Sequence, residues 1–191
     1  MNDGALFNRY ERESAKRVFA AEFREAFYHF KVGTDEKSPT YILLPTGERC
    51  NRVFIAGTLT EKKKSDGETG FYQIRVMDPT GVFFASAGSF QPEAMHQISS
   101  LESPSYVAVI GKPNVYQSQD GRNLVSVRAE SVAAVDKSTV DLWIMDTAKL
   151  TLDRIEQNND DQDHQKAKEI YSHPFEFWRP KVKDALNSIT L

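Results

Sequence analysis

The sequence predicts a mainly β fold with flanking helices, centred on a small closed barrel of five strands. Two observations lead to this prediction. Between residues 51 and 135, apolar and polar residues alternate with a period of two in four or five segments, which is typical of strands with one buried face. One short segment with helical spacing of its apolar residues lies before the fourth strand.

In the first strand, every second residue is expected on the interior face. This set is Val53, Ile55, Gly57 and Leu59, and it alternates with Phe54, Ala56, Thr58 and Thr60. A glycine in the middle of a strand indicates a bulge or a sharp bend, which a small barrel needs in order to close. Residues 62–70 are polar and contain two glycines, so we expect a hairpin loop there.

The second and third strands are joined by the sequence Asp-Pro-Thr-Gly at 78–81, a strong turn signal. The interior set of the second strand is Tyr72, Ile74 and Val76. The third strand, 82–87, has two candidate faces. One face holds Phe83, Ala85 and Ala87, and the other face ends in Ser86. We favour the first set as core because it is wholly apolar, and this choice turns Phe84 outward.

The helical segment spans residues 92–101 and begins with a proline, which suits a first helical turn. Residues 106–111 are apolar on both faces, which indicates a strand covered on both sides. Residues 119–122 have the composition of a hairpin turn. The last strand turns Val125, Val127 and Ala129 inward. The order of three strands, a helix and two strands is that of the Greek-key OB barrel.

The flanks of the barrel divide the chain into further parts. Residues 1–40 contain an amphipathic pattern over 11–30, predicting a helix that packs on the barrel or docks a partner. We assign 41–137 to the barrel, with a short strand at 41–44 leading into it, and 138–157 to a helix after the barrel. Residues 158–191 form an acidic linker and a small C-terminal helical element beginning at Pro174 or Pro180.

The helix after the barrel is expected to run from Val140 to Glu156, with Ser138 or Thr139 as its cap. Its apolar stripe includes Trp143 and needs a surface to cover it. That surface is either the chain's own barrel or a helix from another chain. Residues 157–168 are polar and acidic, and we expect a solvated segment, either a linker or a frayed helix.

Composition excludes several functional classes. No run of about 18 apolar residues is present, which argues against a membrane span, and residues 1–14 lack the apolar stretch of a signal peptide. One cysteine and four scattered histidines offer no metal-ligand spacing. We therefore expect a cytoplasmic protein without metal or cofactor. Asp78 and Glu130 lack catalytic partners in sequence, and no catalytic motif is present, so we expect no enzyme.

The charge is distributed unevenly along the chain. The net charge is −3, and residues 49–135 hold nine Lys and Arg against eight Asp and Glu, a net charge of +1 that leaves −4 for the flanks. Binding of nucleic acid through bulk charge is therefore disfavoured. Any such binding has to depend on a local groove that combines cations with stacking side chains.

Several segments resemble an archaeal family of replication protein A-associated OB-fold proteins. They are RESAKRVFAAEFREAFYHFKVGTDEKSPTYILLPTGERCNRVFIAGTLTE, RVMDPTGVFFASAGSFQPEAM, SPSYVAVIGKPNVYQSQDGR and VSVRAESVAAVD, within residues 11–155. The resemblance implies a protein similar to the middle-sized subunit of replication protein A. Such a protein works in the nucleoid beside a larger OB-fold subunit, binding single-stranded DNA in replication, repair and recombination. Some members carry a C-terminal winged-helix domain, for which this chain is short.

The resemblance also implies that the helix after the barrel packs with its counterparts into a bundle. The predicted subunit interface is Val140, Trp143, Ile144, Leu152 and Ile155. Packing of this stripe on the chain's own barrel is the alternative.

An OB barrel binds single strands across its second and third strands and the flanking loops. We therefore predict contacts from outward aromatic and cationic residues in those regions. The lysines at 62–64 are expected on the first hairpin loop. Lys112, Tyr116 and Arg122 are expected on the loop between the last two strands. The predicted DNA-binding residues are Lys62, Lys63, Lys64, Phe71, Arg75, Phe84, Lys112, Tyr116, Arg122 and Arg128.

Two main functional hypotheses follow. The first is a single-stranded DNA-binding subunit of an archaeal replication protein A complex. The second is an assembly subunit of that complex with little direct contact to DNA, which the nearly neutral barrel and the aromatic-rich flanks favour. An enzyme is the third class, and it would need a pocket with clustered polar groups that the sequence does not show.

Overall fold

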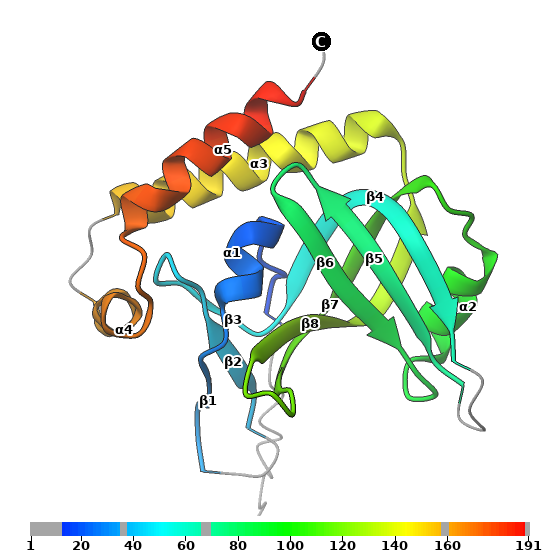
Figure 1. Ribbon diagram of the computed structural model, residues 1–191, viewed down its shortest axis with the longest axis horizontal. Helices are drawn as coiled ribbons and strands as arrows, with labels where there is room; N and C mark the ends of the chain where they lie inside the picture. Colours follow the sequence, from blue (N-terminus) through cyan, green and yellow to red (C-terminus); the bar gives the residue numbers. More distant parts are fainter. Residues whose placement is uncertain (1–12, 35–37, 66–69, 158–160, 190–191) are drawn as a thin grey trace, which may run out of the picture.

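A computed structural model of the protein describes residues 13–34, 38–65, 70–157 and 161–189. Five strands form a closed barrel with the order β4-β5-β6-β8-β7 (Figure 1). The strands are β4 (Val53–Lys64), β5 (Tyr72–Asp78), β6 (Gly81–Ala87), β7 (Ser105–Gln117) and β8 (Asn123–Ala134). β6 and β8 pair in parallel, and the other neighbours pair antiparallel. With α2 (Pro92–Ser100) between β6 and β7, the chain adopts an OB fold.

The barrel interior contains the side chains that the alternation predicts. The buried apolar residues on these strands include Val53, Ile55, Leu59, Ile74, Val76, Phe83, Ala85, Ala87, Val125, Val127 and Ala129. Gly57 allows two strands to approach closely, because a Cβ at this position would lie 2.2 Å from the Met77 carbonyl oxygen. The register shift in β4 itself falls between Leu59 and Glu61.

Two hairpins of the barrel, β4–β5 and β7–β8, have longer strands than predicted. β4 continues to Lys64, so the three lysines at 62–64 lie in a strand and not in a loop. β7 and β8 remain paired out to Gln117 and Asn123, which places Lys112 and Tyr116 in a strand as well. The turn itself covers residues 118–122, which include the predicted 119–122, with Gly121 at φ +83°. In the connection between β4 and β5, residues 66–69 lie outside the described part of the chain.

The N-terminal region differs from the predicted long helix. Among the residues described in this region, only those of α1 (Ala20–Glu25) are helical, and β1 (His29–Lys31), β2 (Thr40–Leu43) and β3 (Arg49–Cys50) form a separate three-stranded sheet. The chain before α1 is extended and bonded to the barrel: the Lys16 amide donates to the Arg52 carbonyl (2.8 Å), and the Phe54 amide donates to the Lys16 carbonyl (2.9 Å). The barrel therefore begins at Val53 and not at residue 41.

Helix α3 (Lys137–Glu156) packs along the outside of β4 and β7 (Figure 1). This contact explains why residues 106–111 are apolar on both faces. The helix begins one turn earlier than predicted, because Asp136 caps it by accepting a hydrogen bond from the Thr139 amide (2.8 Å). The Trp143 indole is buried on the barrel and donates to the Phe54 carbonyl oxygen (2.9 Å).

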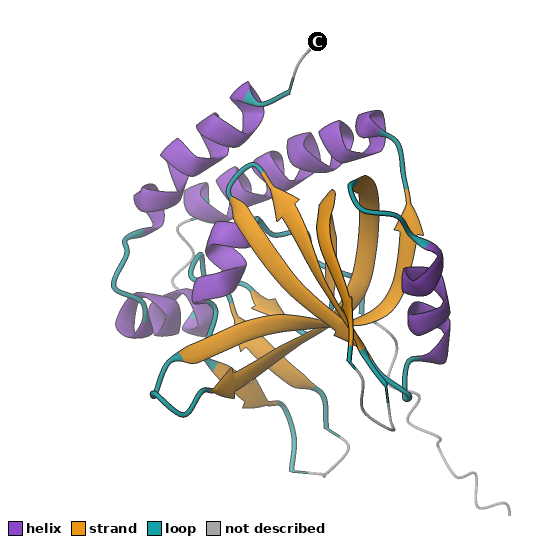
Figure 2. Ribbon diagram, turned by 45° about the vertical axis from the view of Figure 1, so that its right-hand side comes forward, coloured by secondary structure: helices purple, strands orange, loops and turns teal. Residues whose placement is uncertain are grey.

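The C-terminal region folds back on the rest of the chain. After α3 come α4 (Gln162–Ile170), the short 3₁₀ helix η1 (Phe175–Phe177) and α5 (Trp178–Asn187), and α5 packs along α3 (Figure 2). Residues 162–168 belong to α4 and are not a solvated linker, since His164 and Ala167 are buried. Among the described residues, no helix is long and apolar enough to cross a membrane.

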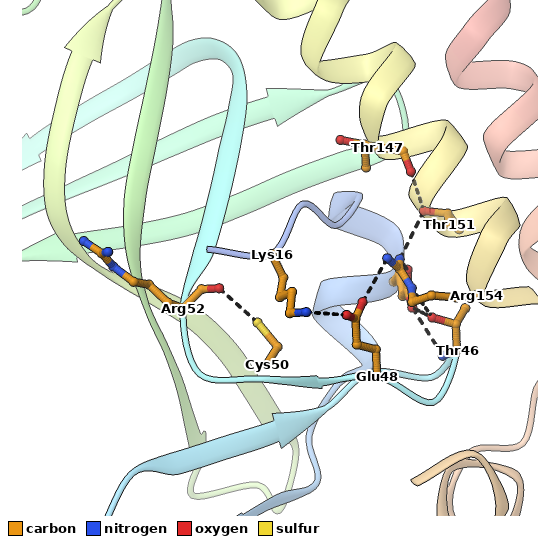
Figure 3. A network of polar contacts seen from close by, with 9 residues as sticks. Lys16, Thr46, Glu48, Cys50, Arg52, Thr147, Thr151 and Arg154 are labelled. Carbon is orange, nitrogen blue, oxygen red and sulfur yellow. Dashed lines mark hydrogen bonds and ion pairs between the residues drawn. The ribbon is translucent and has the colours of Figure 1, made fainter. Parts of the chain in front are cut away.

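A buried polar network joins α1, α3 and the turn between β2 and β3 (Figure 3). At its centre Arg154 donates to Glu22 Oε2 (3.0 Å), Thr46 Oγ1 (2.7 Å) and Glu48 Oε2 (3.3 Å). Glu22 also accepts the Thr46 hydroxyl (2.5 Å) and amide (3.2 Å). Lys16 donates to the second oxygen of Glu48 (2.6 Å). The network therefore fixes three segments that are distant in sequence.

Replacing Arg154 with alanine should lower the free energy of unfolding by about 3–5 kcal/mol, because Glu22 would remain buried without its cation. Denaturant unfolding measures this change. Arg179→Ala is the matched control, since this arginine pairs with Glu156 and Glu176 in an exposed position and should cost less than about 1 kcal/mol. Equal losses in the two variants would contradict the central role of Arg154.

The single thiol offers a second test of the packing. Cys50 is fully buried next to this network, and burial raises the pKa of its thiol to about 12. Because the thiolate is the reactive form, a disulfide reagent at pH 8 should label the folded chain very slowly and the urea-unfolded chain rapidly. Complete labelling of the folded chain within seconds would show that this region opens.

Candidate nucleic-acid interface

Two rows of side chains cross the outward face of the barrel. In the first row, Glu61 on β4 is opposite Arg75 on β5, which is opposite Phe84 on β6. In the second row, two residues further along the strands, the registered residues are Lys63, Gln73, Ser86 and Arg128. The residues between the rows, such as Ile74 and Ala85, face the interior, so both rows face outward.

All residues of these rows except Arg128 form one side of a groove of about 500 Å³. The opposite side comes from the outer part of the β7–β8 hairpin, and Arg24 enters from α1. The lining residues outside the two rows are Arg24, Ile74, Ala85, Asn114, Tyr116, Asn123, Leu124, Val125 and Ser126. In Figure 1 the hairpin extends beyond the barrel towards α1, and contacts between α1 and β8 confirm that they are neighbours. Three separate parts of the chain therefore build the groove.

Phe84 is the aromatic centre of the groove. The residue is 40% exposed, and two guanidinium groups lie over its ring. The distance from the Cζ atom to the ring centroid is 5.5 Å for Arg75 and 5.8 Å for Arg24. An exposed ring beside fixed cations can stack with a nucleobase while the cations contact phosphate.

Glu61 moderates this positive charge. Its carboxylate pairs with Arg75 (2.8 Å) and with Lys63 (2.5 Å). The hydrogen bond from Lys63 and the nearby Arg75 lower the pKa of Glu61 below its ordinary value. The carboxylate is therefore ionised at neutral pH, and it competes with any phosphate for the two cations.

The position of Arg24 depends on the anchoring of α1. The carboxylate of Asp78 accepts a hydrogen bond from the Ala20 amide (2.7 Å), and Thr80 Oγ1 accepts one from the Ala21 amide (3.0 Å). On its inner side α1 carries Glu22, which pairs with Arg154. These contacts fix the short helix over β6 and β8 and hold its outward arginine near Phe84. Asp78 is thus buried and structural, whereas a turn or surface role was expected from the sequence.

Six of the ten predicted DNA-binding residues lie in or beside the groove, and four lie elsewhere. Four of them line the groove together: Lys63, Arg75, Phe84 and Tyr116. Arg128 is registered with Ser86 in the second row, and Lys112 lies opposite Arg128.

The remaining predicted residues lie elsewhere. Lys62 donates to the carbonyl oxygens of Ile98 (3.3 Å), Ser99 (3.1 Å) and Leu101 (2.5 Å), so it caps the end of α2. Lys64 lies over the Tyr72 ring. Arg122 pairs with Asp120 in the exposed turn. Phe71 lies beyond the groove, next to Gly88.

Sequence reasoning missed several groove residues. Strand alternation alone could have identified Gln73, because it lies between Phe71 and Arg75 on the same face. Arg24 could not be found in this way, since the expected helix over 11–30 gave no sign of which polar residue would meet the barrel. Asn114, Asn123 and Leu124 depend on the length of the β7–β8 pairing.

The predicted subunit interface is corrected by the structure. Val140, Trp143, Ile144 and Ile155 are buried within the chain, and the half-buried Leu152 packs against the same core. These side chains contact the chain's own core, which was the alternative expectation. The apolar residues that α3 leaves exposed are Leu142, Met145 and Leu150.

Comparisons with known proteins support the fold. No protein-family model and no curated protein matches the chain in sequence. Among solved structures, a chain of the S. pombe Stn1–Ten1 complex is similar at 13% identity and a TM-score of 0.59, over 83% of this chain and 100% of that one.

Two further structures are more distant. A structure of yeast Stn1 and Ten1 matches at 12% identity and a TM-score of 0.47, over 66% of this chain and 64% of that one. The second single-stranded DNA-binding protein of Mycobacterium smegmatis matches at 19% identity and a TM-score of 0.39, over 47% and 89%. Function has to be argued from the groove itself, because one fold serves many functions.

Proposed function

We propose that this chain binds single-stranded DNA in the groove between the β5–β6 face and the β7–β8 hairpin. The observation that carries the proposal is the exposed ring of Phe84, with Arg24 and Arg75 near it and Lys63 in the neighbouring row. A stacking ring and convergent cations are the two components of binding to single strands without sequence preference. The face of the second and third strands of an OB barrel, together with the flanking loops, is also where such ligands bind.

The weak net charge of the barrel limits the affinity of this groove. One stacked base contributes about 1–3 kcal/mol, and few cations are available to contact phosphate. We therefore expect modest affinity for the isolated chain, with salt dependence set by a small number of phosphate contacts. A second DNA-binding chain would be needed for tight binding.

The resemblance to replication protein A-associated proteins supports a more specific proposal. On this view the chain is a subunit of an archaeal replication protein A complex, acting beside a larger OB-fold subunit in replication, repair and recombination. The similar S. pombe chain comes from a structure of two proteins in complex, which agrees with a heteromeric assembly.

The second candidate function is assembly of that complex with little contact to DNA. The observation that favours it is the outer face of α3, where Leu142 is 59% exposed and Met145 is 54% exposed. The two residues lie three positions apart, on one face of the helix. They could contact a partner without disturbing the buried side of α3.

Anisotropy of a labelled single strand, titrated with the purified chain at two salt concentrations, tests the proposed function against a duplex control. Phe84→Ala should raise Kd roughly 5- to 150-fold, which corresponds to the loss of one stacked base. Leu142→Ala is the control, since it removes an exposed apolar side chain of α3 that does not line the groove. Absence of binding by the unaltered chain at micromolar concentration would favour the assembly role instead.

Removing the negative charge from the groove gives an independent prediction. Glu61→Gln should lower Kd, because Arg75 and Lys63 would become available to phosphate. The plot of log K against log salt should steepen by about 0.7 for each additional phosphate that the freed cations neutralise. Glu176→Gln makes the same change of charge outside the groove, in η1, and should alter neither quantity. Equal effects of the two variants would show that only net charge matters.

A further inference from the structure

Phe90 has the largest exposed fraction of the large apolar side chains in the described part of the chain, 93%. It lies in the short connection between β6 and α2. A single exposed apolar residue is common on protein surfaces and does not by itself indicate a binding site. Two further features indicate a binding role for Phe90: the connection that carries it is rigid, and a second exposed aromatic residue lies on the adjoining face of the barrel.

The connection that carries Phe90 is fixed by hydrogen bonds. The Gln91 amide donates to the Gly88 carbonyl (2.8 Å), and the Gly88 amide donates to the Gln91 side-chain oxygen (3.2 Å). Pro92 then begins α2, whose far end is capped by Lys62 through three carbonyl groups. Phe90 is thus presented on a rigid support, and a preorganised side chain loses little conformational entropy on binding.

The outward face of the barrel continues from the groove towards this support. Beyond the pair Gln73–Ser86, the next position on that face holds Phe71, which is 38% exposed. Its neighbour is Gly88, where a Cβ would lie 3.8 Å from the Phe71 Cβ. Because Gly88 has no side chain, nothing from this position covers the Phe71 ring. Phe71 lies directly before β5, four residues from Arg75, or about 13 Å at 3.3 Å per residue of extended chain.

We propose that Phe71 and Phe90 form a second stacking site for bases of the same single strand that occupies the Phe84 groove. The cationic and polar row between the two sites, from Lys63 through Gln73 and Ser86 to Arg128, would contact the intervening phosphates. A path of ring, cations and ring matches a single-stranded nucleic acid. The inference rests on the proposed function and extends it from one site to a path.

The test is a length series of homopolymeric single strands, from about 4 to about 16 nucleotides, which covers the range of site sizes for OB folds. Phe90→Ala should weaken binding of the longer strands by roughly 5- to 150-fold and leave binding of the shortest ones unchanged. Phe84→Ala should weaken binding at every length. Leu142→Ala is the control for loss of an exposed apolar side chain.

A direct optical readout is available at the same position. The native tryptophans, Trp143 and Trp178, are each 2% exposed, so an indole introduced by Phe90→Trp would be the accessible fluorophore in the described part of the chain. Stacking with a base should quench its fluorescence when a long strand is added, and a short strand should leave it unchanged. Since Phe90 contributes almost no buried surface, both variants should keep the melting temperature of the unaltered chain.

The failure of this inference can be distinguished from the failure of the proposed function. If the unaltered chain binds no single strand, the proposed function fails and the second site fails with it. If binding depends on Phe84 but Phe90→Ala has no effect at any length, and Phe90→Trp is not quenched, only the second site is overturned. An equal loss at every length for Phe90→Ala would also overturn it.

Discussion

The buried ion pair between Arg154 and Glu22 is the contact on which the arrangement around the barrel depends (Figure 3). Both side chains are almost completely buried, so each needs the other and the hydroxyl of Thr46 to compensate for lost hydration. The pair connects the last helix turn of α3 to α1 and to the β2–β3 turn. α1 is only six residues long and could not keep its orientation through its own backbone hydrogen bonds.

The same pair links the outer layer of the molecule to the groove. α1 presents Glu22 to the buried network and Arg24 to the solvent side, where it lies near Phe84. At its beginning, α1 is held by the Asp78 carboxylate in the turn between β5 and β6. The site is therefore formed by the barrel together with a segment that precedes it in sequence. The barrel has little net positive charge, but Arg24 and Arg75 both lie beside the exposed Phe84 ring. This local arrangement compensates for the weak overall charge.

The errors of the sequence interpretation have a common physical cause. Lys62 and Lys63 are adjacent and look equivalent, yet one caps α2 and the other faces the groove, because neighbouring strand residues point to opposite faces. Trp143 looked like an interface residue because an apolar stripe shows that one face of a helix is covered. The stripe does not show whether the covering surface belongs to the same chain or to another. The region 11–30 has apolar residues at helical spacing, but of its described residues only 20–25 are helical: Val18 and Phe19 are buried in the extended chain before α1, and Phe30 lies in β1.

The sequence by itself determined the barrel: its strand order, the inward and outward faces of four of its strands, the turns at 78–81 and 119–122, and hence the outward direction of Arg75 and Phe84. These features follow from a period of two and from turn chemistry, which are properties of neighbouring residues. Only the tertiary structure decided which outward residues share a groove, that Arg24 joins them, and that α3 packs on its own barrel. Those features depend on contacts between segments far apart in sequence, whose distances no local pattern contains.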